Sequence, residues 1–311
     1  LSPKHQTQKS IDKKIIELAY DSIKNTLPLP GGTSNIIYNH KLQQVEQQFM
    51  SLIGTIRNCS GGITPWNTWL TCEESTAKAS DKLSKDHGYV FEVPANATSM
   101  VEATPIVAMG RFNHEAACVD PRTGIVYMTE DRNDSLLYRF IPKVKGDLHQ
   151  GGRLQALTIY QQPKFDTRNW AQASMTLNKE METRWVYLDT PESPNDDLRL
   201  QGHKAGAAIF ARGEGIHWGN NELYFCCTSG GAKQLGQIMR YVPSSTEEGS
   251  LASHHHGKLS LFVESDNKQS LNYGDNITVA PNGHLIVCED QYTKHVENHL
   301  KGVTESGQTY D

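Results

Sequence analysis

The sequence lacks several features that mark whole classes of proteins. No run approaches the ~18–20 consecutive apolar residues that a membrane-spanning helix needs. The net charge is -5 and the pI is about 6.2, so the chain has no overall basic field of the kind that attracts nucleic acid. We therefore expect no membrane span and no nucleic-acid partner.

Several short motifs of known chemistry are also missing. The 311 residues contain no P-loop, no GxSxG nucleophile elbow and no CxxC pair with zinc-site spacing. The first ten residues, LSPKHQTQKS, contain no apolar stretch of the signal-peptide type. This start fits a cytosolic protein, or a protein whose targeting segment was removed before this numbering begins.

The six cysteines fall into two kinds of surroundings. Five lie in apolar, strand-like runs, where we expect buried free thiols that behave as small hydrophobic side chains: Cys72, Cys118, Cys226, Cys227 and Cys288. Cys59 instead lies in the polar, glycine-rich stretch RNCSGG. It is therefore the cysteine best suited to bind a metal or another partner.

The most informative feature is a loose internal repeat, in which a turn precedes a short apolar strand that ends in Thr or Cys and acidic or small residues. The four copies are TPWNTWLTCEE (64–74), DPRTGIVYMTED (120–131), WGNNELYFCCTSGG (218–231) and APNGHLIVCEDQ (280–291). A second strand that ends at proline follows three of them, at 88–94, 136–142 and 237–243. Apart from one longer gap, the spacing of about 50 to 60 residues is typical of propeller blades.

An all-β fold of the β-propeller type follows from this repeat. A single blade cannot bury both of its faces, whereas radial packing of blades buries them and leaves only short edges. The alternative is an open sandwich of hairpins, which the repeat favours less. We expect one domain over residues 1–311, with a peripheral, partly helical segment at 1–30 (helix within 11–24) and a surface excursion between blades at 143–206. Only four or five blade-like units are evident, so we expect terminal blade strands to lie outside this numbering.

Acidic residues gather at the ends of the repeated strands. These are Glu73 and Glu74, Glu130 and Asp131, and Glu289 and Asp290, with further polar groups in NHEAA (113–117), ARGEG (211–215) and YGDN (273–276). The innermost strands of a propeller line its channel, so these carboxylates can converge, and they then repel unless cations compensate them. Oxygen ligands suit calcium, and carboxylate with thiolate suits iron. The alternative is a set of solvated strand ends.

Two further clusters have competing interpretations. Arg212 and Glu214 project to the same side of an extended chain, so Arg212 could hold an anionic substrate while Glu214 holds a metal. They could equally form a structural ion pair. The histidines at 254–256 cannot easily aim at one ion, because alternate side chains on a strand point apart, and we expect an exposed loop there.

Long blocks of the sequence resemble the PhoX family of bacterial alkaline phosphatases. The matching blocks are GTIRNCSGGITPWNTWLTCEE (54–74), MGRFNHEAACVDPRTGIVYMTEDR (109–132), FARGEGIHWGNNELYFCCTSGGAKQLGQIMRYVP (210–243) and YGDNITVAPNGHLIVCED (273–290). They occur in the family's order, and the resemblance covers roughly residues 30 to 300. It implies a six-bladed propeller that hydrolyses phosphomonoesters with iron (Fe³⁺) and calcium (Ca²⁺) ions at the channel mouth. It also implies a twin-arginine-exported, periplasmic or secreted protein, which we expect to be a monomer acting on small phosphate esters.

The resemblance also assigns roles to single residues. Cys59 is similar to the family's iron-ligating cysteine, and Arg212 looks like the arginine that binds the substrate phosphate. The residues that resemble its metal-binding carboxylates are Glu115, Glu214 and Asp275, joined by Glu73 or Glu74. The sequence departs from the family at Tyr273, where phosphatase members have a lysine, so one phosphate-binding cation is missing.

Two other functions remain open from the sequence alone. A calcium-dependent lactonase or esterase propeller would use Glu214 and the Asp275–Asn276 pair for a single calcium, but it would leave Cys59 without a role. A non-catalytic propeller would bind protein or envelope components, because the fold does not fix the function.

Overall fold

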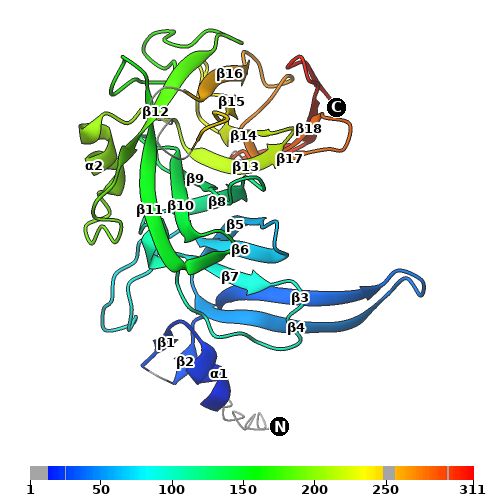
Figure 1. Cartoon of the computed structure of the whole chain (residues 1–311). Helices are drawn as coiled ribbons and strands as arrows, with labels where there is room; N and C mark the ends of the chain where they lie inside the picture. Colours follow the sequence, from blue (N-terminus) through cyan, green and yellow to red (C-terminus); the bar gives the residue numbers. More distant parts are fainter. Residues whose placement is uncertain (1–12, 25, 248–255, 293) are drawn as a thin grey trace.

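The computed structural model of the chain describes residues 13–24, 26–247, 256–292 and 294–311. Antiparallel strands dominate it, and Figure 1 shows their sheets following one another through the molecule. The repeat units of the sequence become four meanders, which we call sheets A to D. Their strands are, for sheet A, β5 (Asn58–Ile63), β6 (Thr68–Glu73) and β7 (Val90–Pro94); for sheet B, β8 (His114–Val119), β9 (Val126–Glu130), β10 (Tyr138–Val144) and β11 (Asp147–Ile159); for sheet C, β13 (Gly213–Gly219), β14 (Glu222–Cys227), β15 (Gln237–Val242) and β16 (Lys258–Glu264); and for sheet D, β17 (Gly274–Val279), β18 (Leu285–Glu289), β19 (Leu300–Val303) and β20 (Thr309–Tyr310).

The turns between the first two strands of each sheet lie where the sequence predicts them. Each contains a residue with a left-handed backbone conformation: Asn67 in sheet A, Gly124 in sheet B, Asn220 and Asn221 in sheet C, and Gly283 in sheet D. Asparagine and glycine tolerate positive φ better than other residues, so these positions permit the tight reversals that define the meanders.

Buried apolar side chains fill the spaces between successive sheets. Leu70 and Phe112 belong to the cluster between sheets A and B, Tyr127 and Phe225 to that between B and C, and Cys226 and Val287 to that between C and D. This face-to-face packing is what the propeller prediction requires, because each sheet buries apolar surface against its neighbour. Of the five cysteines expected to be buried, Cys288 is an exception and is exposed.

The range 143–206 differs from the expected surface excursion. It contains β11, β12 (Met181–Tyr187) and a helix, α2 (Leu198–Ala205). Strand β12 pairs with β11 over five residues and with β16 over two, so it joins the outer strands of sheets B and C into one nine-stranded sheet. The prediction failed because the sequence METRWVY, in which Glu182, Arg184 and Tyr187 are exposed, has no long apolar run.

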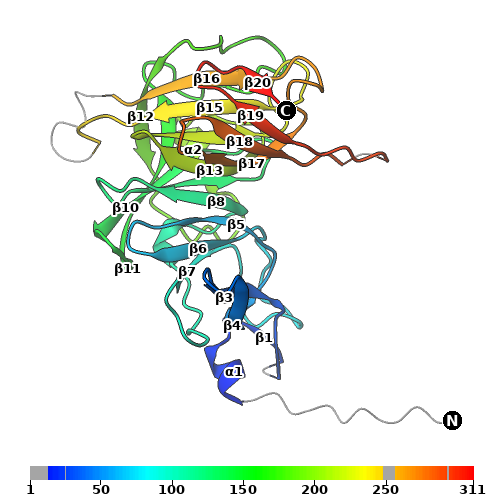
Figure 2. The ribbon, with the colours of Figure 1, turned by 90° about the vertical axis from the view of Figure 1, so that its right-hand side faces the viewer.

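The N-terminal elements lie at the periphery, as Figures 1 and 2 show. They are α1 (Lys13–Leu18), the short strands β1 (Ser22–Ile23) and β2 (Leu27–Pro28), and a projecting hairpin of β3 (Gly31–Asn39) and β4 (Gln44–Thr55). The helix is shorter than the predicted 11–24, of which residues 11 and 12 lie outside the described part. A 3₁₀ turn (Val107–Met109) precedes β8. No helix in the described ranges is long and apolar enough to cross a membrane.

The first strands of the four sheets lie next to one another in chain order, β5 beside β8, β8 beside β13 and β13 beside β17. The Asn276 Nδ2 amide donates a 3.2 Å hydrogen bond to Ser60 Oγ, which brings β17 back to β5. The beginnings of these four strands therefore meet around one point.

Candidate metal centre

Each first strand begins with the same β-bulge. In all four sheets two residues of the first strand stand opposite one residue of the second, between a paired position before the bulge and a paired position after it. The first bulge residues are Cys59, Glu115, Glu214 and Asp275. A bulge re-aims side chains next to a functional site, and here it gives four predicted site residues one common position in the fold.

The backbone just before the bulge is also repeated. Arg57, Arg212 and Tyr273 each lie two residues before a bulge residue and have φ of 45°, 52° and 55°. This left-handed region is uncommon for residues other than glycine, and it persists only where the surroundings impose it. In each of these sheets the carbonyl of this residue accepts a hydrogen bond from the N–H at the end of the second strand, from Glu74, Thr228 and Asp290 respectively.

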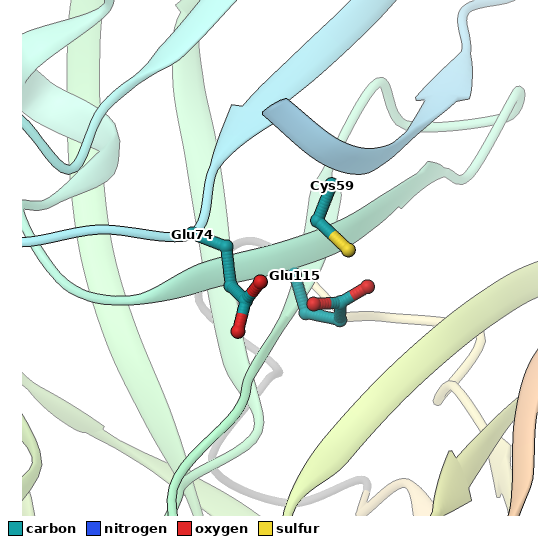
Figure 3. A group of neighbouring side chains, drawn as sticks. All are labelled: Cys59, Glu74 and Glu115. Carbon is teal, nitrogen blue, oxygen red and sulfur yellow. The ribbon is translucent and has the colours of Figure 1, made fainter. Parts of the chain in front are cut away.

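The bulge residues form two groups with the spacing of metal ligands. Cys59, Glu74 and Glu115 offer one donor atom each within 4.8 Å of one another, and so do Glu115, Glu214 and Asp275. Glu115 belongs to both groups. Figure 3 shows the Cys59 sulfur, the Glu74 carboxylate and the Glu115 carboxylate turned toward a common space.

The electrostatics of the cluster are unfavourable without a cation. Burial, and then the negative charge of neighbouring acids, raises the pKa of Glu115 and of Glu214, and burial with the charge of Asp290 raises the pKa of Asp275. Burial and the Glu115 charge likewise raise the pKa of the Cys59 thiol. Buried carboxylates that repel one another are stable as anions only when a positive charge compensates them. Thiolate and carboxylate donors therefore fit metal ions at this position.

Arg212 lies at the edge of the cluster and supplies part of that positive charge. Its Nε donates to Asp131 Oδ1 at 2.7 Å, and its Nη2 donates to Asp131 Oδ2 at 3.0 Å and to Glu214 Oε1 at 2.9 Å. Burial opposes its charge, but Asp131 and Glu214 hold its pKa above the usual value. The side chain stays 31% exposed, so the guanidinium is within reach of a small anion from solvent.

The structure separates the two glutamates that the sequence left as alternatives. Glu73 is fully buried and accepts hydrogen bonds from the backbone N–H groups of Ile56, Gly88 and Tyr89, while His87 Nδ1 lies 2.7 Å from its Oε1. Its carboxylate is therefore occupied by the protein itself. Glu74, the next residue, points to the opposite side and joins Cys59 and Glu115.

The same alternation holds in sheets B and D and identifies residues that the predicted site omitted. Glu130 and Glu289 are buried like Glu73, with Tyr138 and Asn272 among their partners. Asp131 and Asp290 correspond to Glu74, and their charges act on Glu214 and Asp275. The sequence signal was the pair of acids at the strand ends of sheets A, B and D, but only the strand direction shows which member faces the cluster.

Two remaining sequence features lie outside the cluster. Tyr273 supplies no cation beside Asp275, and its backbone carbonyl forms the turn described above. Of the three histidines, 254 and 255 lie outside the described residues. His256 stacks on Tyr160 with ring centroids 4.3 Å apart and lies 3.1 Å from the Thr183 carbonyl through Nδ1.

Comparison with solved structures shows which known fold the chain resembles. The structure of Pseudomonas fluorescens PhoX in complex with vanadate, a transition-state analogue, matches with a TM-score of 0.57 at 18% sequence identity, covering 88% of this chain and 64% of that chain. The chain thus spans less than two thirds of that relative, and the match confirms a β-propeller fold. A gluconolactonase from Xanthomonas campestris (TM-score 0.41, 11% identity, 90% of this chain and 75% of that chain) and a glucose dehydrogenase (0.43, 12%, 85% and 73%) are too distant to support an inference.

Comparison of the sequence identifies the family. No curated protein matches the chain. The family model described as alkaline phosphatase PhoX matches residues 24–311, which is nearly the whole chain. The chain therefore belongs to the PhoX family of alkaline phosphatases.

Proposed function

We propose that this chain forms the active site of a metal-dependent phosphomonoester hydrolase. The observation that supports this most strongly is the convergence of Cys59, Glu115, Glu214 and Asp275 from four equivalent bulges, with Arg212 beside them. Acidic strand ends without a function would have no reason to be buried together at a cost in charge repulsion. Membership of the PhoX family gives this arrangement its reaction class.

The two groups of donors differ in chemistry, and we assign them different ions. The group of Cys59, Glu74 and Glu115 combines a thiolate with carboxylates, which suits Fe³⁺. The group of Glu115, Glu214 and Asp275 contains oxygen donors alone, which suits Ca²⁺. On this assignment Glu115 is shared between the two sites.

The residues of the chain divide the remaining work. Metal ions at such a site supply Lewis-acid stabilisation of the charge on the phosphoryl group. Arg212 binds a phosphoryl oxygen and holds the ester in place, because its guanidinium is charged, partly exposed and adjacent to Glu214. Asp131 fixes the plane of the guanidinium through its two hydrogen bonds, so that the arginine is oriented before the substrate arrives.

The family also suggests where the protein works and on what. We propose small phosphate monoesters as substrates and a periplasmic or secreted location. Both are what the resemblance of this chain to the PhoX family implies.

Phosphate release from 4-nitrophenyl phosphate tests the proposed function. The metal-loaded protein should hydrolyse this ester, and Glu115→Gln should lose at least about 100-fold in kcat, because Glu115 joins both donor groups. Glu180→Gln is the matched control, since Glu180 is an exposed acid paired with Lys258 away from the cluster. Equal activity of Glu115→Gln and the wild type would refute the assignment.

A further inference from the structure

A cavity opens beside the cluster. It has a volume of about 440 Å³ and is lined by Arg57, Glu74, Ser75, Thr76, Ala77, Asn113 and Arg132. Glu74 lines this cavity and also belongs to the donor group with Cys59, so the cavity adjoins the cluster. We call it the arginine pocket.

The lining of the arginine pocket is rich in hydrogen-bond donors. Arg57 has a 66% exposed side chain and donates from Nη2 to Glu74 Oε2 at 2.8 Å. Arg132 has a 34% exposed side chain, and its Nη2 lies 3.2 Å from Asp196 Oδ2. Asn113 contributes an amide that donates to Glu74 Oε1 and to the Asp131 carbonyl. Ser75 and Thr76 are half-buried, and their hydroxyls donate no hydrogen bond to any residue that the structure describes. Two guanidinium groups thus share one cavity with the single acidic side chain of Glu74 in its lining.

A third arginine lies beneath the pocket. Arg111 is 1% exposed, and its guanidinium donates to the backbone carbonyls of Thr76, Ala77 and Ser193, with no carboxylate hydrogen-bonded to it among the described residues. Because the peptide bond is planar and trans, the carbonyl of Thr76 points to Arg111 and the N–H of Ala77 points the opposite way. A buried cation bound only to carbonyls adds positive potential to this side of the molecule.

Arg57 occupies in sheet A the position that Arg212 occupies in sheet C. Each lies two residues before a bulge residue, has a positive φ and accepts a hydrogen bond from the end of the second strand. Arg212 donates to Glu214 in the group with Glu115 and Asp275, whereas Arg57 pairs with Glu74 and lines the arginine pocket. The repeat therefore presents two arginines at two sides of one cluster.

From this arrangement we propose that the arginine pocket binds a second phosphate group of the substrate, so that the site favours esters with two phosphates over esters with one. The proposal rests on the proposed phosphatase function, whose site supplies the position of the first phosphate. Arg57 and Arg132 would pair with the second phosphate through charge-assisted hydrogen bonds, with Ser75, Thr76 and the Ala77 N–H as further donors.

Selectivity between two related sugars tests the proposal. We would measure kcat/KM of the metal-loaded protein for fructose 1,6-bisphosphate and for fructose 6-phosphate. The wild type should prefer the bisphosphate by about tenfold, which corresponds to one additional charge-assisted interaction. In Arg57→Gln/Arg132→Gln this ratio should fall to about one through a higher KM for the bisphosphate. Arg57 also holds Glu74, so its replacement can change kcat/KM for both sugars. The ratio of the two values is not affected by a change that both sugars share.

Controls keep the test decisive. Arg153→Gln removes an exposed arginine that contacts Tyr187 and should leave the ratio unchanged. Arg132→Gln alone should lower the ratio partly and serves if the double variant does not fold. A wild-type ratio near one, or an unchanged ratio in the double variant, would overturn the proposal while hydrolysis of fructose 6-phosphate upholds the proposed function. If neither sugar is hydrolysed, 4-nitrophenyl phosphate still tests the proposed function separately. Calorimetric binding then decides the pocket: bisphosphate bound more weakly by the double variant supports it, and equal binding overturns it.

Discussion

Glu115 and Glu214 stand at the same bulge position in neighbouring sheets, and both are buried although their donor oxygens lie within 4.8 Å of each other. The Thr129 hydroxyl donates to the Glu214 carbonyl at 2.5 Å and accepts a hydrogen bond from the Ala116 N–H, so the two bulges are fixed to one another. The fold thus holds two acids together in a place where burial, and then the charge of Glu115, raises the pKa of Glu214.

This repulsion should make the metal-free protein less stable as the pH rises. A carboxyl group whose pKa is raised by folding destabilises the folded state progressively above its ordinary pKa of about 4.3, up to its raised value. Between pH 5 and pH 8, the free energy of unfolding of chelator-treated wild type should fall by at least about 1.4 kcal/mol more than that of Glu214→Gln. Urea unfolding across this pH range measures the difference.

Metal binding should reverse that effect. Calcium added at pH 8 should raise the stability of the wild type and have a smaller effect on Glu214→Gln. Parallel pH profiles of the free energy of unfolding for the two metal-free proteins would show that folding does not raise the pKa of Glu214.

Glu73 and Glu74 should separate fold stability from metal binding. Glu73→Gln disturbs a buried carboxylate that pairs with His87 and three N–H groups, so the free energy of unfolding should drop by about 3 kcal/mol. Glu74→Gln should leave stability without metal nearly unchanged and lower the iron content. Urea unfolding combined with metal analysis distinguishes the two, and iron loss confined to Glu73→Gln would invert our assignment.

Arg212 should not be replaceable by lysine. Asp131 orients Arg212 through two nitrogens, and a lysine ammonium cannot form this planar pair. We expect Arg212→Lys to lose about 10- to 100-fold in kcat/KM for 4-nitrophenyl phosphate, close to the loss in Arg212→Gln. Arg240→Lys, which alters an arginine paired with Glu222 outside the cluster, should remain active. Full activity of Arg212→Lys would show that a point charge suffices there.

Much of the fold could be predicted because its determinants are local. The turn residues Asn67, Gly124 and Gly283 mark the meanders directly, and the apolar strands between them repeat. Strand β12 could not be found in this way, because its charged residues Glu182 and Arg184 face solvent and its pairing depends on the distant β11 and β16. The six-bladed form stays a prediction, since the described residues form the four meanders A to D and the peripheral hairpins β1–β2 and β3–β4.

The sequence could name most residues of the candidate site, but it could not show how they are arranged. Cys59, Glu115 and Glu214 stand out by motif and resemblance, and the structure brings them together with Asp275. The bulge cannot be seen in one strand, because it is a mismatch between two. For the same reason the sequence could not show that Glu74 faces the cluster while Glu73 faces the interior, or that Asp131 holds Arg212.

The metal content of purified, chelator-washed protein tests the central claim most directly. Elemental analysis of the wild type should find iron and calcium in a fixed ratio. Cys59→Ser should lose iron and retain calcium, whereas Cys288→Ser, which changes an exposed cysteine outside both donor groups, should retain both. Calcium without iron in the wild type, or unchanged iron in Cys59→Ser, would contradict the account.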